Sequence, residues 1–473
     1  MAHKPFPKPL SIRRLLGPSY ILLALGLGSG EVILWPYLTS NYGLGIAWGA
    51  LLGITFQFFL NMEIERYALL KGESVFIGLA NRWKWAPYWF AISTFIGFGI
   101  PGIIAASAEV FAHLIGADDF KWTAIFFLLA IGLVLSLGQT VYGILEKTTK
   151  TIIYVAVPFI FILAIIIATK MDWIELFQGL GGVGKGYRWL PEGISFAAFF
   201  AAFAYSGAGG NLNLTQSIYI KEKGYGMGKY AQKIEGLFRG SIGKQKIKLT
   251  GETFAMTESN LKNFRSWWRR INLEHLMIFW FFGGLAMLLL MLLSYATTYG
   301  LPSNVEGIKF VINEGLIVGQ QFGSAIGTLF LLAVSIMLFQ TQLGVMDSTS
   351  RIMAENVAIK KTQFDGEQRV PLSRIYYIFL WAQIFLGITL FLFNIKEPRT
   401  LIILGAVINA FTMFVHVGMV NWMNHKTLPK QVQAALWRKI IILIVFLFFG
   451  AFSAYTIYQY LFCGLLPMIP CVV

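Results

Sequence analysis

The residues best suited to do chemistry are a carboxylate and three glycines that precede it. Glu31 follows Gly26, Gly28 and Gly30 inside an apolar run that covers about residues 15–38. A run of that length predicts a membrane-spanning helix, and a carboxylate at membrane depth is costly and marks a functional site. Glycine lets the backbone leave the helix, so that free carbonyls and the acid together could bind a cation. Close helix packing against Gly26 and Gly30 is the alternative interpretation.

A second interrupted helix is expected at residues 194–221. Its apolar half ends at Tyr205, a glycine-rich run covers residues 206–210, and a polar half begins at Asn211. Two breaks at matching positions, five spans apart, are typical of transporters built from inverted repeats. We therefore expect spans 1–5 and spans 6–10 to form such a pair.

The predicted binding groups lie at these two breaks. Backbone carbonyls around Gly28 and Ala208 would supply oxygens, and Glu31 and Asn211 are the predicted metal-ligating side chains. Each of the two side chains begins a second half-helix, where the helix dipole favours a carboxylate.

Membrane helices must position these residues, because composition predicts a polytopic membrane protein. The chain has 473 residues, of which 56% are hydrophobic and only 13% are charged, whereas soluble proteins carry about 25% charged residues. We expect one domain over residues 1–473, with repeat one at 15–169, repeat two at 194–422, an extra helix at 438–462 and a cytoplasmic loop at 223–272. The expected spans are 15–40, 45–65, 88–115, 121–141, 151–169, 194–221, 274–298, 320–350, 373–394, 400–422 and 438–462.

Basic residues predict the orientation of the chain. With eleven spans, 31 of the 38 Lys and Arg residues fall on the side of the N-terminus. By the positive-inside rule, the N-terminus is cytoplasmic and the C-terminus external, in a plasma membrane. The net charge of +15 then reflects topology, and no nucleic-acid partner is expected. Cys463 and Cys471 lie beyond the last span, and whether they pair stays open.

Four other groups of polar residues are predicted inside spans or at their ends. Glu109 and His113 lie four residues apart, so they could relay protons, or His113 could simply meet water at the outer boundary. Asp347 could complete the ion site or pair with Arg351. The stripe formed by Asn409, Thr412 and His416 suits either a pathway lining or hydrogen bonds between helices, and Glu63 and Glu65 beside Arg66 suit an inner ion pair or gate.

At these motifs the chain resembles the Nramp family of divalent-metal transporters, within the group that shares the LeuT fold. The resemblance covers most of the chain by topology. It implies an all-α polytopic membrane protein of about eleven transmembrane helices, with a LeuT-like 5+5 inverted repeat and discontinuous helices 1 and 6. The stretches that carry it are Gly17-Pro-Ser-Tyr20, Ala108-Glu109 and Asn211-Leu-Asn-Leu214.

The chain departs from the family at the ligand motifs. Gly28-Ser-Gly-Glu31 stands in place of Asp-Pro-Gly-Asn, and Ala208-Gly-Gly210 in place of Met-Pro-His. In the third span, Glu109 matches the glutamate of Asp-x-x-Glu, and Ala106 takes the aspartate position. Without a thioether, the remaining oxygen donors suit harder ions such as Mg²⁺ or Mn²⁺.

The expected function is secondary transport of a divalent cation of the Mn²⁺, Mg²⁺ or Fe²⁺ class, coupled to protons through Glu109 and His113. A small organic solute such as an amino acid or amine is the alternative substrate, and a sensor built on a transporter fold is a third hypothesis. No permanently bound cofactor is expected. The sequence carries no Walker loop and no nucleophile elbow, so we do not expect an enzyme. The predicted partners are the lipid bilayer and a small ion or solute, and the oligomeric state is left open.

Overall fold

The structure is a computed structural model of the whole chain, and it describes residues 3–11, 15, 18–26, 28–137, 141–231, 245–246, 249–305, 307–364 and 369–459. Within these ranges the chain is almost entirely helical, with a short hairpin, β1–β2, and a second short antiparallel pair, β3–β4, whose strands lie far apart in the sequence. Cys463 and Cys471 lie outside the described residues.

The elements have the following bounds: α2 Pro18–Gly26, α3 Trp35–Tyr42, α4 Ala47–Lys71, α5 Val75–Arg82, α6 Ala86–Phe98, α7 Gly102–Ile115, α8 Lys121–Leu137, α9 Val141–Ile167, α10 Lys170–Leu180, α11 Phe196–Ala204, α12 Thr215–Glu222, α13 Glu258–His275, α14 Gly283–Thr298, α15 Lys309–Phe322, α16 Ser324–Phe364, α17 Leu372–Leu392, α18 Pro398–Thr427, α19 Leu436–Tyr458, β1 Val183–Gly184, β2 Tyr187–Arg188, β3 Gln245–Lys246 and β4 Arg369–Val370.

The first and sixth spans are broken, as predicted. In the first span, α2 ends at Gly26 and a π-helical segment, Ser29–Leu34, leads into α3. In the sixth span, α11 ends at Ala204, and a 3₁₀ segment, Gly210–Leu214, leads into α12. Gly207, Gly209 and Gly210 all have positive φ, which side chains with a Cβ rarely adopt, so this glycine run is what permits the second break.

The predicted spans all correspond to helices or to broken helix pairs. By length and hydropathy, seven helices among the described residues could cross a membrane, or eight if the bent pair α9–α10 is counted. The half-helices of the two broken spans are too short to be counted singly, and α8 falls in a shorter apolar class. The all-α polytopic fold predicted from the sequence is thus confirmed.

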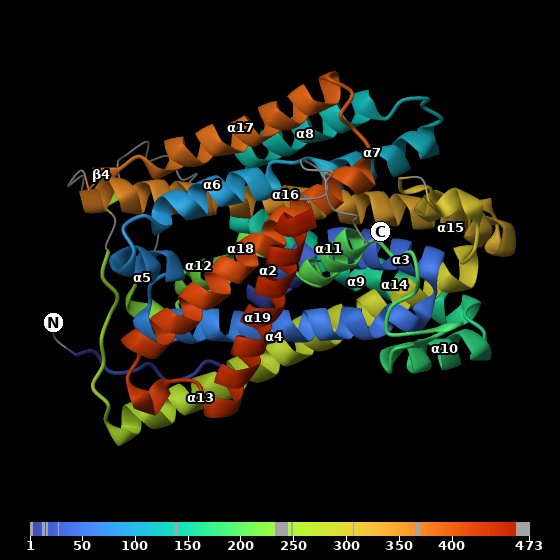
Figure 1. Cartoon of the computed structure of the whole chain (residues 1–473). Coiled ribbons are helices and arrows are strands. Elements are labelled where there is room, and N and C mark those ends of the chain that lie inside the picture. Colours follow the sequence, from blue (N-terminus) through green and yellow to red (C-terminus); the bar gives the residue numbers. More distant parts are fainter. Residues whose placement is uncertain are drawn as a thin grey trace.

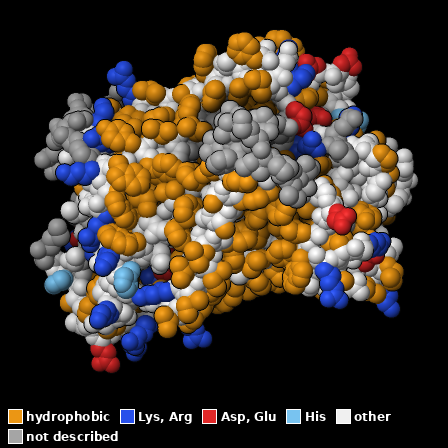
Figure 2. Space-filling view, viewed as in Figure 1, with side chains coloured by type: hydrophobic (Ala, Val, Ile, Leu, Met, Phe, Trp, Pro, Cys, Tyr) orange, Lys and Arg blue, Asp and Glu red, His pale blue; other side chains and the backbone are white. Residues whose placement is uncertain are grey.

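The long helices lie side by side, and the short elements gather at the two ends of the bundle (Figure 1). The N-terminal segment, α5 and α13 lie at one end, which we call the N-terminal end. The helices α10 and α15 lie at the opposite end. Hydrophobic side chains form a broad belt across the face seen in Figure 2, with Lys and Arg mostly beyond it at the two ends. This distribution matches a lipid-facing surface between two aqueous faces.

Helices α10 and α18 both begin with side-chain caps. Thr169 and Asp172 form a reciprocal capping box at the start of α10. The carboxylate of Glu397 accepts from the backbone N–H of Thr400 at 2.5 Å, at the start of α18. These caps place the turns around α10 and α18 at the end of the bundle opposite the N-terminus.

Two regions pack in ways that hydropathy does not indicate. The glycine-rich stretch at residues 179–186 folds as the end of α10 followed by the β1–β2 hairpin, which lies against Gly45. Trp267 is buried, and its indole N–H donates to the carbonyl of Pro7 at 3.0 Å. The N-terminal segment covers it, and hydropathy alone does not encode that contact.

Candidate functional site

The two helix breaks meet each other in the middle of the bundle. A Cβ on Gly30 would overlap the backbone carbonyl of Tyr205, and a Cβ on Gly26 would lie 2.9 Å from the backbone of Gly207. The glycines of one break therefore allow the backbone of the other to approach. The close-packing interpretation of Gly26 and Gly30 thus holds, whereas cation binding at this break stays a prediction.

Glu31 lies at this meeting point and is completely buried. Its Oε1 is 2.8 Å from the place that a Cβ on Gly26 would occupy. Neither carboxylate oxygen has a hydrogen-bond partner of normal geometry among the described residues, and only the backbone N–H groups of Gly28 and Glu31 itself come near it. A buried carboxylate with both oxygens unsatisfied carries a large free-energy penalty unless it binds a proton or a cation.

Gln57, on α4, holds the second break in its open shape. Its side-chain N–H donates to the carbonyl of Ala204 at 2.9 Å, and its Oε1 accepts from the backbone N–H of Gly209 at 3.1 Å. One amide side chain thus replaces two of the hydrogen bonds that an unbroken helix would make. Trp35 adds a cross-link between the two broken spans, because its indole N–H donates to the Ser206 hydroxyl at 2.8 Å.

Asn211 lies at the start of the second half-helix, where it was predicted, but its side chain turns towards α6 and α18. Its Nδ2 donates to the hydroxyls of Ser93 (2.9 Å) and Thr94 (3.0 Å). Its Oδ1 lies 3.4 Å from His416 Nδ1. The structure therefore places the Asn211 side chain in an interhelical network, and its role as a metal ligand stays a prediction.

The polar stripe on α18 belongs to the same network. Asn409 donates to the carbonyl of Gly97 at 2.8 Å and to the hydroxyl of Tyr205 at 2.9 Å. Asn409 thus forms hydrogen bonds between helices, which is the second of the two roles predicted for the polar stripe. His416 Nε2 and Asn409 Oδ1 have no partner within the described ranges.

Gly28 and Ala208, the two predicted backbone sites, are both buried at the breaks. Gly28 faces α16, where a Cβ would overlap the side chain of Thr341. The backbone N–H of Gly28 donates to the carbonyl of Gly26 at 2.5 Å, across the break. These contacts place α16 beside the first break, although they do not test whether the carbonyls bind an ion.

Asp347 pairs with Arg351, the second of its two predicted roles. Its Oδ2 lies 2.8 Å from Arg351 Nε, and its Oδ1 accepts from the Tyr376 hydroxyl at 2.7 Å. Arg351 also lies 3.7 Å from Glu222, at the end of α12. Both oxygens of Asp347 are engaged in this network, so our proposal below does not use it as an ion ligand.

Glu109 and His113 lie towards the end of the bundle opposite the N-terminus. The carboxylate of Glu109 is half-buried and faces Glu397, Lys309 and Lys396. His113 is exposed, and no hydrogen bond joins it to Glu109 in the described part of the chain. The exposure of His113 fits the prediction that it meets water, and the role of Glu109 in proton movement stays a prediction.

Glu63 and Glu65 point to different sides of α4. Glu63 forms an ion pair with Arg66 at 2.8 Å and lies 3.8 Å from Arg438. Glu65 instead contacts His275 and Gln216. Of the predicted ion pair or gate, the structure shows the ion pair, and only through Glu63, because residues three apart on a helix lie on one face whereas residues two apart do not.

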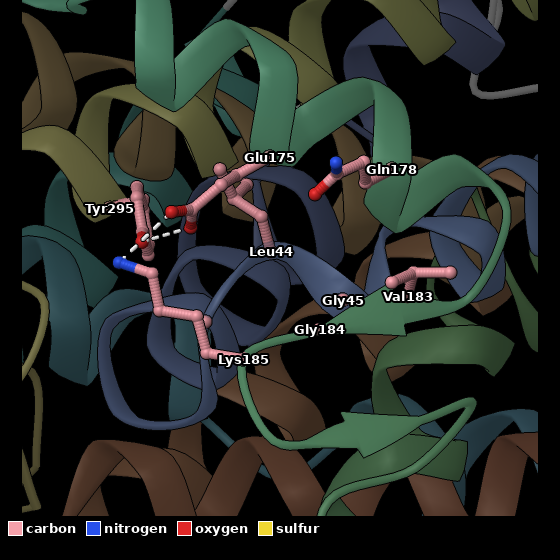
Figure 3. A pocket seen from close by; sticks show the side chains of 9 residues that line it. Leu44, Gly45, Glu175, Gln178, Val183, Gly184, Lys185 and Tyr295 are labelled. Carbon is pink, nitrogen blue, oxygen red and sulfur yellow. Dashed lines mark hydrogen bonds and ion pairs between the residues drawn. The ribbon is translucent and has the colours of Figure 1, made fainter.

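A pocket lies at the far end of the bundle, between α10, the β1–β2 hairpin and α14 (Figure 3). Lys185, on the hairpin, reaches Glu175 of α10 at 3.0 Å, and the hydroxyl of Tyr295 also donates to Glu175. Hydrogen bonds to Tyr295 and Glu175 raise the pKa of Lys185, so this lysine stays charged. The pair fastens the hairpin over the end of the bundle.

Gln57, Trp35 and Tyr205 support the site but were not predicted from the sequence. Only Gln57 had a usable signal, because Gln57, Asn61 and Glu65 repeat every four residues within an otherwise apolar part of α4. Tyr205 acts mainly through its backbone carbonyl, which no side-chain pattern reveals.

No protein-family profile matches the chain, and no curated protein matches it in sequence. Among solved structures, a mutant of the Eremococcus coleocola manganese transporter superposes with a TM-score of 0.70 at 13% identity, covering 98% of this chain and 91% of the transporter. Mhp1, a nucleobase-cation-symport-1 family transporter, superposes with a TM-score of 0.53 at 12% identity, covering 96% and 95%. At these identities the comparison shows only that the chain shares the fold of these two transporters.

Proposed function

We propose that this protein is a secondary transporter for a cation and that Glu31 is the principal ligand. The observation that carries the proposal is the fully buried Glu31 carboxylate. Both of its oxygens lack hydrogen bonds of normal geometry from the described residues, at the point where two broken helices meet. An uncompensated charge at this depth calls for a positive partner. A transported cation would be that partner. It would enter the site from one side of the membrane and leave it towards the other.

The donors at the breaks favour a divalent ion with a preference for oxygen. Glu31 supplies a carboxylate, and the unwound backbone around Gly28 and Ala208 supplies carbonyls. No sulfur or imidazole replaces the family's Met and His at residues 208–210. Such a donor set suits Mg²⁺ or Mn²⁺ better than softer metals. The fold shared with a manganese transporter is compatible with this choice.

The two breaks also suggest how the protein could expose the site to alternate sides. Short half-helices such as α2 and α12 can tilt as separate units, because the breaks interrupt their backbone hydrogen bonds. The N-terminal end would face the cytoplasm of a cell bounded by a plasma membrane, since 31 of the 38 basic residues belong to that side. We also propose that movement of the cation is coupled to movement of protons.

The test uses purified full-length protein and a matched control. Saturating Mn²⁺ or Mg²⁺ should raise the melting temperature, by an amount equivalent to about 2.7 kcal/mol at one hundred times Kd. Glu31→Gln should abolish the shift and also cation uptake into proteoliposomes. Glu314→Gln is the control, because Glu314 is another buried acid with an unsatisfied oxygen among the described residues, but it lies on α15. An ion-induced shift that survives in Glu31→Gln would refute the proposal.

A small organic cation, such as an amine, is the second candidate. One observation favours it. No group of three or more His, Cys, Asp or Glu residues suited to a metal occurs in the described ranges. Glu31 would then pair with an ammonium group. Melting shifts with a panel of amines, but not with Mn²⁺ or Mg²⁺, would support this candidate.

A further inference from the structure

A second set of buried titratable side chains lies nearer the N-terminal end, away from the helix breaks. It consists of Glu65 on α4, Glu274 and His275 at the end of α13, Ser19 on α2 and Gln216 on α12. All five are buried. Helices α2, α4, α12 and α13 reach this point from distant parts of the sequence, so the cluster exists only in the folded protein.

Short contacts, three of them hydrogen bonds, connect the five side chains. The Ser19 hydroxyl donates to Glu274 Oε2 at 2.5 Å and lies 3.0 Å from His275 Nδ1. His275 Nδ1 is in turn 3.3 Å from Glu65 Oε1, which also accepts from Gln216 Nε2 at 2.6 Å. The imidazole is packed between the rings of Phe58 and Phe279. The imidazole and hydroxyl thus bridge two carboxylates.

The cluster is incomplete as it stands. Glu65 Oε2, Glu274 Oε1, Gln216 Oε1 and His275 Nε2 each lack a hydrogen-bond partner among the residues that the structure describes. Buried polar atoms are normally satisfied, so two buried carboxylates that each keep one unpaired oxygen favour an occupant that removes part of their charge.

The charges around the cluster require that occupant to be positive. Glu65 and Glu274 repel each other, and the nearby basic side chains are committed elsewhere. Arg66 pairs with Glu63, Lys221 with Glu355, and Arg270 with the carbonyl of Leu10. The other titratable group facing Glu274 is Tyr20, which is neutral below its ordinary pKa. Two buried carboxylates so close together cannot both stay ionised without a proton or cation.

A buried polar line on α4 connects this cluster with the helix breaks. Gln57, Asn61 and Glu65 repeat every four residues, so they share one face of the helix. Gln57 contacts the second break, and Glu65 belongs to the cluster. Asn61 lies between them, buried, with no partner for either amide atom within the described ranges. The line faces the broken sixth span, because α4 packs against the 3₁₀ segment and α12.

We propose that Glu65, Glu274 and His275, supported by Ser19 and Gln216, form a proton-binding site that is separate from the cation site at Glu31. The occupant is a proton, because either carboxylate can hold one on its own oxygen, and His275 and Ser19 lie between the two acids. The described residues also offer no three-ligand metal group here. The proton's role in transport rests on the proposed function. Loss of the proton would leave two buried carboxylates that repel each other. The repulsion would weaken the contact of Glu274 on α13 with Ser19 on α2, which is the first half of a broken helix.

The first test needs no substrate, so it stands even if the proposed function fails. The melting temperature of the purified full chain is measured between about pH 6 and about pH 9. It should fall as the pH rises, because removal of the shared proton leaves two buried charges. In Glu65→Gln and Glu274→Gln, one charge is gone, and the fall should shrink by about half or more. Glu258→Gln is the control, since Glu258 is exposed on the same α13 and should keep the wild-type dependence.

The second test connects the site to transport. Mn²⁺ is added to proteoliposomes that contain a pH-sensitive dye, and protons moved per Mn²⁺ are counted. Glu274→Gln should lower this ratio about fivefold or more, whereas Glu31→Gln should remove Mn²⁺ movement itself. An unchanged pH dependence of melting in both Glu65→Gln and Glu274→Gln would overturn the proton site. A wild-type ratio in Glu274→Gln would overturn its role in coupling.

Discussion

The carbonyl of Tyr205 occupies the space that any side chain at residue 30 would need, so Gly30 and Tyr205 bring the two broken helices into backbone contact. Glu31 is the residue after Gly30, so this backbone contact also fixes where its carboxylate lies. The tightness of this crossing explains why the acid is shielded from water although it lies beside two helix ends. The predictions below test this arrangement and the elements that support it.

Gly30→Ala should destabilise the fold. The added methyl group must displace the backbone of Tyr205, and overpacking of this kind costs about 1–3 kcal/mol. The measurement is the melting temperature of the purified protein. Gly284→Ala is the control, because a Cβ at Gly284 on α14 would meet only Ile54 at 3.8 Å. That control should be neutral or slightly stabilising, and equal losses in both variants would contradict the crossing described above.

Gln57→Leu should open or distort the second break. The change removes both hydrogen bonds to the backbone of Ala204 and Gly209, which should cost about 1–3 kcal/mol of folding free energy. Asn61→Leu, one turn along the same helix, should cost nothing or stabilise, because its amide has no partner in the described part of the structure. The measurement is the melting temperature of each variant. A larger loss in Asn61→Leu than in Gln57→Leu would show that Gln57 does not support the second break.

Phe6→Ala should release the N-terminal segment from α13. Phe6 is buried against Phe254 and Phe264, and loss of a buried phenylalanine typically costs about 3–5 kcal/mol. Limited proteolysis should then cut the first residues much faster than in the wild type. Lys8→Ala is the comparison, since Lys8 is exposed. Equal protection of Phe6→Ala and wild type would show that other contacts hold the segment.

Asp119→Asn should weaken the outer turn between α7 and α8 in a pH-dependent way. A hydrogen bond from Lys396 at 2.7 Å lowers the pKa of Asp119 below its ordinary value. A carboxylate with a lowered pKa contributes stability at neutral pH that is lost as the pH falls through that pKa. Because the pair is largely exposed, the effect should be below about 1 kcal/mol. Melting temperatures of wild type and variant should converge in acid, and a constant difference would contradict this account.

Much of the fold and the centre of the site could be predicted from the sequence. Long apolar runs required membrane helices, because an unpaired backbone cannot cross lipid. Gly28 and the glycine-rich run at residues 207–210 indicated the two breaks. Glu31 was a candidate because charged side chains are rare at membrane depth. The pairing of Asp347 was correctly among the predicted alternatives, since Arg351 lies one turn away on the same helix.

The sequence alone determined which segments enter the membrane, where two of them break and which break carries an acid. These properties depend on local composition and on the conformational freedom of glycine, both of which are written along the chain. Only the tertiary structure decided that the Asn211 side chain donates to Ser93 and Thr94. It likewise decided that Glu65 contacts His275 and not Arg66. Such contacts join residues far apart in sequence. They depend on how whole helices pack, and no local pattern encodes the rotation of one helix against another.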